Sequence, residues 1–235
     1  MCRMIMAYGN FSVKQVMEAV RSMCCGETAQ HDGPIKAHPN GWGCLWLEND
    51  RIHTLHGSGS FADELPGINI TCIHTRFLAV HVRHATLTKN MGIQFSHPLL
   101  RQCNNVQWYL MHNGFLPTIY PHIGLDTSHF DSAEYLEYVV SNITKEDLTL
   151  RYMTEKMTKL EPGGSSGNAF FINNRKAFAW QWYPEDTLFP DYFTMHIYKH
   201  GDTQYISSER IIDLGVASDW RSMRNHELYA ISLVE

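Results

Sequence analysis

Cys2 is the residue whose type and position carry the most specific chemistry. It directly follows Met1, so removal of the methionine would leave a thiol and a free α-amine on the same carbon. A cysteine thiol titrates near ~8.5 and an α-amine near ~7.7–8.0, so the amine can accept the thiol proton without a histidine base. The alternative is a cysteine packed in a buried strand, which is the commoner place for this residue type.

Arg83 is a cation inside an otherwise apolar strand, in the stretch AVHVRHAT at residues 79–86. Burying a guanidinium without a partner costs several kcal/mol, so we expect Arg83 to meet an anion. Its planar fork suits a carboxylate, and Thr86 can add a hydroxyl donor to the same group. An internal salt bridge to an Asp or Glu would explain Arg83 equally well.

Asn113 and Gly114 follow each other at the end of a predicted buried strand, residues 106–114. Their side-chain amide and backbone N–H can point at one place, as in an oxyanion hole, where each donor typically contributes about 2.7–4 kcal/mol to transition-state stabilisation. The alternative is an Asn-Gly hairpin turn. The next residues contain two prolines and do not return at once as a paired strand, which disfavours that turn.

Asp131 is expected at the N-cap of a helix over residues 130–143, with Glu134 three positions later. Its carboxylate can accept N–H groups from the first helical turn, which is the ordinary use of aspartate there. It can also accept the amino group of a substrate. Both readings stay open from the sequence.

Strand ends and helix starts are needed to position these residues. The pattern predicts a strand at 2–9 and then a helix at 11–27, with Ser12 and Gln15 as a capping box and Gly26 as its stop. A hairpin is predicted at 41–57, turning at Asn49-Asp50. Further strands are predicted at 75–86, 106–114, 168–173, 176–181, 193–200, 203–208 and 227–232, and helices at 130–143 and 144–164. This order predicts an α+β chain, with two sheets packed together and helices outside, in one domain.

Composition excludes several functional classes. The chain has 235 residues, a net charge of −5 and no run of Lys and Arg, so we expect no nucleic-acid partner. No apolar stretch approaches the roughly 18 residues of a membrane span, and no secretory pattern is present, so a cytoplasmic protein is expected. The six cysteines form no C-x-x-C pair and are expected to be free thiols.

The fourteen histidines do not predict a metal site. His53/His56 and His81/His84 are each spaced by three, and such pairs fall on opposite faces of a strand. The sequence has no H-E-x-x-H motif and no Cys/His cluster. No metal or other cofactor is therefore expected.

Short motifs follow one another from residue 2 to about 132: Met1-Cys2-Arg3, His38-Pro39-Asn40-Gly41-Trp42-Gly43, Arg83-His84-Ala85-Thr86, His97-Pro98, His112-Asn113-Gly114 and Asp131-Ser132. In this order they resemble class II glutamine amidotransferases. These are N-terminal nucleophile hydrolases with a four-layer αββα sandwich fold, so the resemblance implies that fold in a single domain over residues 2–235. The stand-alone branch, which includes γ-glutamyl amidohydrolases, is the most similar.

The resemblance implies a role for each motif residue. Cys2 would be the nucleophile, and Asn113 with Gly114 the oxyanion hole. Substrate binding would fall to Arg83 and Thr86 at the α-carboxylate and to Asp131 at the α-amino group, with His84 beside them. Trp42, Gly43 and His97 would shape the pocket. The implied activity is hydrolysis of the side-chain amide of glutamine or a γ-glutamyl compound, through a thioester on Cys2.

Some residues depart from the family pattern. His84 and Leu87 replace a Trp and a His of the glucosamine-6-phosphate synthase glutaminase domain, and Ala133 stands where a Glu is frequent. No synthase domain follows in these 235 residues, so an ammonia acceptor is expected on a partner synthase or not at all. Two alternatives remain: an ammonia-supplying subunit, and a non-catalytic binding or regulatory module that keeps the pocket.

Overall fold

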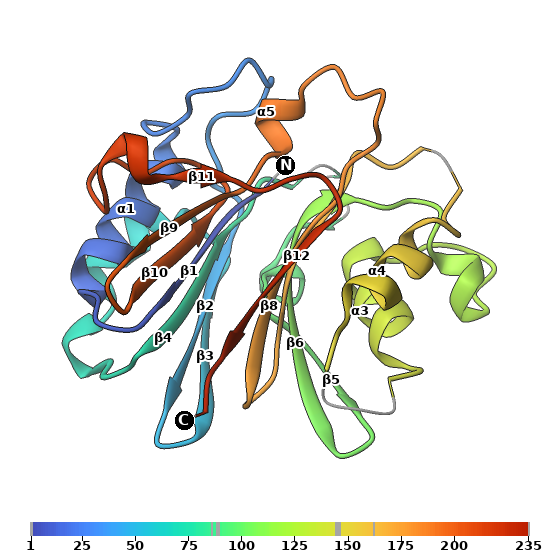
Figure 1. The fold of residues 1–235 in the computed structure, drawn as a ribbon, viewed down its shortest axis with the longest axis horizontal. Helices are drawn as coiled ribbons and strands as arrows, with labels where there is room; N and C mark the ends of the chain where they lie inside the picture. Colours follow the sequence, from blue (N-terminus) through green and yellow to red (C-terminus); the bar gives the residue numbers. More distant parts are fainter. Residues whose placement is uncertain (1, 86, 88–89, 144–146, 162, 235) are drawn as a thin grey trace. The chain divides into compact units, whose positions relative to one another are not determined.

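The described residues, 2–85, 87, 90–143, 147–161 and 163–234 of a computed structural model, fall into two compact units. Unit 1 contains the residues up to Pro98 together with Phe189–Met223, and unit 2 contains Leu99–Leu188 with the residues from Arg224 onward. Each unit is built on one antiparallel sheet and has its own hydrophobic core (Figure 1). Neither unit is a continuous stretch of sequence, so the chain passes between them at three places in the described part.

Unit 1 is organised around strand β1, Arg3–Tyr8, which lies between β10 and β4. Among the described residues its sheet has seven strands in the order β11-β9-β10-β1-β4-β2-β3. The other strands are β2 (Trp42–Glu48), β3 (Arg51–Gly57), β4 (Phe77–Val82), β9 (His196–His200), β10 (Thr203–Ser207) and β11 (Arg221–Ser222). β2 and β3 join at Asn49 and Asp50, both at positive φ, as the hairpin prediction required.

Helix α1, Val13–Cys25, covers one face of this sheet (Figure 1). The helix begins and ends at the predicted caps. The Ser12 side chain accepts the Gln15 N–H, and Gly26 adopts the left-handed conformation of a C-cap. Short helices α2 (Phe61–Glu64) and α5 (Pro190–Phe193) also belong to unit 1.

The strands of unit 1 divide their side chains between two faces, because successive residues of a strand point in opposite directions. Ile5 and Ala7 of β1 pack in the core with α1, as do Leu78 and Val80 of β4. Cys2, directly before β1, falls with Met4 on the opposite face.

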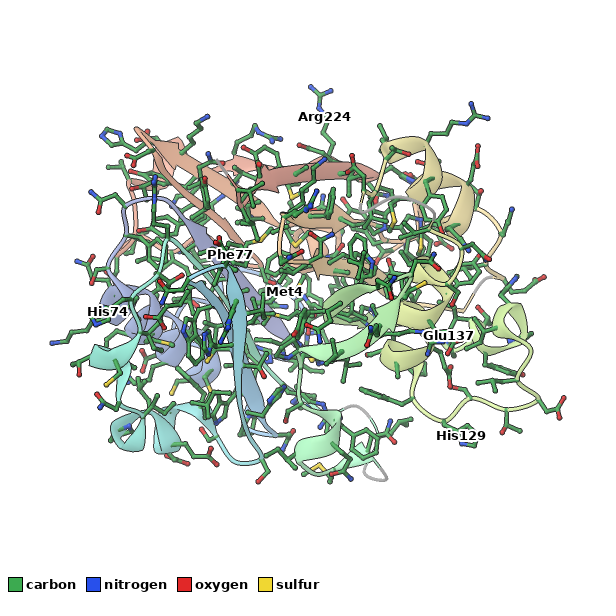
Figure 2. All side chains as sticks on the ribbon, turned by 90° about the horizontal axis from the view of Figure 1, so that it is seen from below. Met4, His74, Phe77, His129, Glu137 and Arg224 are labelled. Atoms are coloured by element: carbon green, nitrogen blue, oxygen red, sulfur yellow. The ribbon has the colours of Figure 1, made fainter. Side chains whose placement is uncertain are left out.

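Figure 2 labels two buried side chains on the face of the sheet that carries Cys2, Met4 of β1 and Phe77 of β4. Neither belongs to the cluster that packs against α1, yet each is no more than 1% exposed. The sheet of unit 1 therefore has apolar residues on both of its faces.

Unit 2 has, in its described part, a five-stranded sheet in the order β12-β8-β7-β6-β5. These strands are β5 (Leu99–Cys103), β6 (Val106–Phe115), β7 (Ser166–Ile172), β8 (Lys176–Gln181) and β12 (Glu227–Ser232). Helices α3 (Asp131–Val140) and α4 (Leu150–Met157) contribute to the core of this unit, in which Tyr135, Val139 and Met153 are buried.

Several sequence-based expectations for unit 2 were wrong in detail. β6 continues to Phe115, one residue past its predicted end at Gly114, and Asn113-Gly114 stays paired with β7, so the disfavoured hairpin turn does not occur there. α4 begins at Leu150, behind a Thr149 cap, and is much shorter than the predicted 144–164, of which 144–146 and 162 lie outside the described residues. Leu150, its first residue, is 53% exposed. β5, which pairs with β6, was not predicted.

The helices of the described part are too short or too polar to cross a lipid bilayer. No group of three or more His, Cys, Asp or Glu residues in that part could hold a metal ion.

Candidate active site

Cys2 lies at the start of β1 in unit 1 and is only 8% exposed. Arg3 pairs with Val82 and Met4 with His81, so this register carried one residue further places Cys2 opposite Arg83, the residue directly after β4. The Cys2 thiol lies 3.9 Å from the His84 carbonyl oxygen, at the long end for a thiol donor. Cys2 and Arg83 therefore lie across from each other where β1 begins and β4 ends.

Arg83 is buried, and its guanidinium donates to two backbone carbonyls, that of Asn40 at 3.3 Å and that of Asn90 at 2.7 Å. Carbonyl oxygens are neutral acceptors, so these two bonds orient the guanidinium without cancelling its charge. Its carbon lies 5.9 Å from the Phe95 ring centroid. Thr86, predicted to assist Arg83, lies outside the described residues, as does Met1.

The segment before β2 holds the end of β4 in place. Asn40 donates its N–H to the Arg83 carbonyl at 2.9 Å and accepts the Ala85 N–H on its side chain at 3.1 Å. Gly41 accepts the Arg83 N–H at 2.8 Å. The Gly41 φ of 117° is one that side-chain-bearing residues rarely adopt, which explains the glycine. Asn40 is thus a positioning residue that the sequence reasoning did not single out.

Two histidines near this strand end stay neutral around pH 7. Burial, followed by the charge of Arg3, lowers the pKa of His38 to about 2, and burial also lowers the pKa of His84. His38 is fully buried, and neither of its ring nitrogens has a hydrogen-bond partner among the described residues. These two imidazoles therefore add no positive charge beside Cys2 and Arg83.

Gly43 and His97, both predicted to shape a pocket, lie against each other. A Cβ on Gly43 would overlap the His97 carbonyl oxygen, so only glycine permits this approach. The His97 ring lies 4.3 Å from that of His81, centroid to centroid. His81 is cross-strand partner to both Met4 and Gly43, which places this cluster close to the start of β1.

Trp42 has a different environment. Its ring belongs to the core that packs against α1, lies 5.2 Å from the Phe61 ring, and donates its N–H to Glu64 at 2.7 Å. Alternation along β2 therefore sends Trp42 to the opposite face from Gly43. A direct role for Trp42 in a pocket beside Cys2 has no geometric support in unit 1.

In unit 2, Asn113 and Gly114 lie inside the β6–β7 ladder, opposite Asn168 and Gly167. The Asn113 carbonyl accepts the Ser166 hydroxyl at 2.9 Å, and the residue is 1% exposed. A Cβ on Gly114 would overlap the Ser166 carbonyl oxygen and crowd the His112 ring. Gly114 therefore serves a close approach of two strands rather than a turn.

Asp131 is the first residue of α3, and the N-cap is Phe130, so the predicted N-cap was wrong by one residue. Glu134 satisfies the backbone amides just before the helix, because its carboxylate accepts the N–H groups of His129 and Phe130. Asp131 instead accepts the Leu116 N–H at 2.9 Å through Oδ2. Its other oxygen, Oδ1, accepts no hydrogen bond from the residues that the structure describes.

His112 links β6 to the start of α3. Its Nε2 donates to the Ser166 carbonyl at 3.2 Å, and its Nδ1 lies 3.0 Å from the Ser132 hydroxyl. Nδ1 also lies 4.0 Å from Asp131 Oδ2, so this ring ties the start of α3 to the β6–β7 ladder.

Unit 1 therefore offers a thiol at the strand end that carries the buried Arg83, and unit 2 offers amide groups on β6 and the buried carboxylate of Asp131 on α3. Sequence reasoning found these residues from motif order. It missed the buried pair of Arg3 and Glu209, which contacts Cys2 directly. The signal was present in Arg3, a charged residue inside a strand that otherwise reads as apolar.

Residues 5–151 match the sequence pattern of the class II glutamine amidotransferases. A search of curated proteins finds no match to the chain.

Solved structures match in fold. An allosteric regulatory enzyme of purine biosynthesis aligns with a TM-score of 0.72 at 16% identity, and the alignment covers 98% of this chain and 47% of that one. Glutamine phosphoribosylpyrophosphate amidotransferase from B. subtilis aligns at 0.70 and 15% identity, with coverages of 98% and 47%. A glutamine aminotransferase class-II domain protein from Silicibacter pomeroyi aligns at 0.59 and 12% identity, with coverages of 98% and 95%.

The chain thus spans about half the length of the first two solved structures and nearly all of the third. At these identities the likeness concerns the fold. It confirms the predicted fold class, a mixed chain with two antiparallel sheets in its described part, of the N-terminal nucleophile type.

Proposed function

Since this chain belongs to the class II glutamine amidotransferases, we propose that residues 2–235 act as one amidotransferase domain that hydrolyses a side-chain amide. The substrate is glutamine or another γ-glutamyl compound, and the nucleophile is Cys2 of the chain that has lost Met1. The observation that carries the proposal is the place of Cys2, buried at a strand start with its thiol beside the Arg83 strand end. The reaction belongs in the cytoplasm, where the cysteines, free in the described part, stay reduced.

The α-amine of Cys2 serves as the base. It takes the thiol proton, and the sulfur then adds to the amide carbonyl carbon to give a tetrahedral oxyanion. The protonated amine gives its proton to the leaving nitrogen, so that ammonia or an amine departs and a γ-glutamyl thioester remains. Water adds to the thioester, the sulfur leaves, and glutamate is released with the thiol restored.

The remaining motif residues hold the charges of this reaction. We assign the oxyanion to Asn113 and Gly114, whose donors stabilise charge that develops only in the transition state. Arg83, with Thr86, takes the α-carboxylate, and the available Oδ1 of Asp131 takes the α-ammonium group. Support comes from the two oriented bonds of Arg83 and from the bond that fixes Asp131 through its other oxygen.

A second candidate function is ammonia supply to a partner synthase. It is favoured by the length of two solved structures of the same fold, of which this chain covers 47%. One of these is a phosphoribosylpyrophosphate amidotransferase, so the fold also occurs in longer chains. In this version the chemistry at Cys2 is unchanged, and only the fate of ammonia differs.

The experiment is glutamate release from glutamine and from a set of γ-glutamyl amides, with protein whose intact mass shows that Met1 is gone. Cys2→Ala should abolish release, and Cys25→Ala, which removes an exposed thiol, should leave it unchanged. A mass that retains Met1 should accompany loss of activity, because the amine is then acylated.

Each outcome decides between the functions. Release that survives Cys2→Ala would exclude Cys2 as the nucleophile. Release that requires a second protein would favour ammonia supply. Tight binding of a γ-glutamyl compound without turnover by Met1-free protein would favour a non-catalytic module and contradict the proposal.

A further inference from the structure

Arg3, the residue after Cys2, is a fully buried cation in unit 1. Its Nε donates to Glu209 Oε1 at 2.6 Å, and its Nη1 donates to the Cys2 carbonyl at 3.1 Å. The guanidinium carbon also lies 4.4 Å from the centroid of the Tyr192 ring. One side chain thus joins the nucleophile's own backbone to a carboxylate that is 206 positions away in the sequence.

Glu209, two residues after β10, is also buried and bonded through both of its carboxylate oxygens. It is 4% exposed, and its second oxygen, Oε2, accepts the Thr28 hydroxyl. Burial by itself would raise the pKa of the carboxyl, but contacts with His31, Arg3 and Thr28 outweigh it and lower that pKa to about 2. Glu209 is therefore ionised across the range in which the protein would work.

Of these neighbours, Arg3 brings the positive charge. Its Nη2 also lies 2.5 Å from His31 Nε2, and the same imidazole nitrogen lies 3.5 Å from Glu209 Oε1. The ion pair proper consists of Arg3 and Glu209.

A buried ion pair is not by itself a gain in stability, because apolar residues of similar volume often serve as well. What apolar residues cannot supply is a directional donor to the Cys2 carbonyl. That bond matters because removal of Met1 leaves Cys2 attached on one side only, and chain ends fray unless tied down. Ser208 secures Met4, two residues after Cys2, since its hydroxyl accepts the Met4 N–H at 3.2 Å and its own N–H donates to the Met4 carbonyl at 2.9 Å.

We propose that the Arg3–Glu209 pair is an anchor that positions the processed N-terminal Cys2 for attack. The anchor acts on the carbonyl side of Cys2, so it leaves the amine free to work as the base. It does not contact the substrate, and Arg3 and Glu209 are positioning residues. The inference rests on the proposed function, in which small displacements of a nucleophile cost about 100-fold in rate.

The test compares three variants of Met1-free protein. In Arg3→Met with Glu209→Met both charges leave together, so the fold should survive. We expect kcat to fall at least about 10-fold while KM for the γ-glutamyl substrate stays within about 2-fold, because substrate contacts are untouched. Arg3→Lys keeps the charge opposite Glu209 but loses the fork, and should also lower kcat.

The matched control is Arg101→Met with Glu137→Met, a pair with the same 2.6 Å separation in unit 2, where Figure 2 labels Glu137. Its members are 40% and 35% exposed, so we expect neither kcat nor KM to change. If the Arg3/Glu209 double variant has the kcat of wild type, the pair does not position Cys2 and the proposal is wrong. If the double variant does not fold, a wild-type kcat in Arg3→Lys would refute the proposal instead.

A second readout does not depend on the proposed function. Cys2 is 8% exposed, and release of its anchor should raise its rate of alkylation by iodoacetamide, read by peptide mass, at least about 10-fold. If no compound is turned over by wild-type protein, the proposed function fails while this rate still tests the anchor. Equal alkylation rates in wild type and in the double variant would refute it.

Discussion

Gly114→Ala tests the close approach of β6 and β7. A Cβ at this position would lie well inside 3.0 Å of the Ser166 carbonyl oxygen, a separation that real Cβ atoms essentially never show. The obstacle is backbone in the neighbouring strand, so no side-chain rotation can relieve it. The His112 ring, which would also be crowded, is itself bonded to that carbonyl and to Ser132.

The two strands must therefore separate locally, and this overpacking should cost about 1–3 kcal/mol. For a chain of this length each kcal/mol lowers the melting temperature by about 2–4 °C, so we expect a decrease of several degrees. The displaced backbone N–H of residue 114 should also stabilise the oxyanion less well. Loss of one such donor lowers kcat by about 100- to 1,000-fold.

Thermal unfolding followed by circular dichroism, together with glutamate release from Met1-free protein, measures both effects. Gly67→Ala is the matched control, because an added Cβ there meets nothing within 4 Å, and it should melt as wild type does. A Gly114→Ala protein that melts within about 1 °C of wild type would refute the close-approach argument. One that melts lower but keeps its kcat would refute the oxyanion role alone.

Three further predictions concern charge and protonation. Arg83→Met should raise KM for the γ-glutamyl substrate by more than about 10-fold, as expected for loss of a charge-assisted contact to its carboxylate, and an unchanged KM by initial-rate kinetics would exclude that role. Asp131→Asn keeps an acceptor for the Leu116 N–H, so its melting temperature should hold while KM rises; a lower melting temperature with unchanged KM would make Asp131 purely structural. His38→Gln should make the free energy of unfolding less dependent on pH in the acid range. The pKa of His38 is about 2 in the folded protein and near ~6.5 in the unfolded chain, so the unfolded chain takes up a proton first. The stability that neutral His38 contributes above pH 6.5 is therefore lost as the pH falls. Urea unfolding should show wild type losing about 2 kcal/mol more than this variant between pH 7 and pH 5, and equal losses would contradict the neutral buried state of His38.

Local chemistry explains the elements that the sequence predicted well. α1 begins at Ser12 and ends at Gly26, because a cap needs only a side-chain acceptor and a left-handed residue within a few positions. The Asn49-Asp50 hairpin likewise depends on two residues that tolerate positive φ. The motif order that led to Cys2, Arg83 and the amidotransferase family is also legible without a structure.

Errors arose where distant strands competed with local preference. β6 runs one residue past its predicted end at Gly114, because pairing with Asn168 and Gly167 satisfies the backbone groups of Asn113 and Gly114 in the ladder. At α3, Glu134 captures the amides before the helix, and Asp131 is left to bind Leu116 across the loop. Such outcomes depend on which strand or backbone amide the fold brings beside each residue, and the local sequence pattern does not contain that information.

By itself the sequence determined the family, the fold class and the identity of the motif residues, because each depends on residue types in a fixed order. Tertiary structure decided which face each motif residue occupies: it sends Trp42 to the core with α1 and Gly43 against His97. It also joins Arg3 to Glu209 from the other end of the chain and aims the guanidinium at the Cys2 carbonyl. Burial makes this pairing necessary, since a charge removed from water must find its counterpart wherever folding brings one within reach.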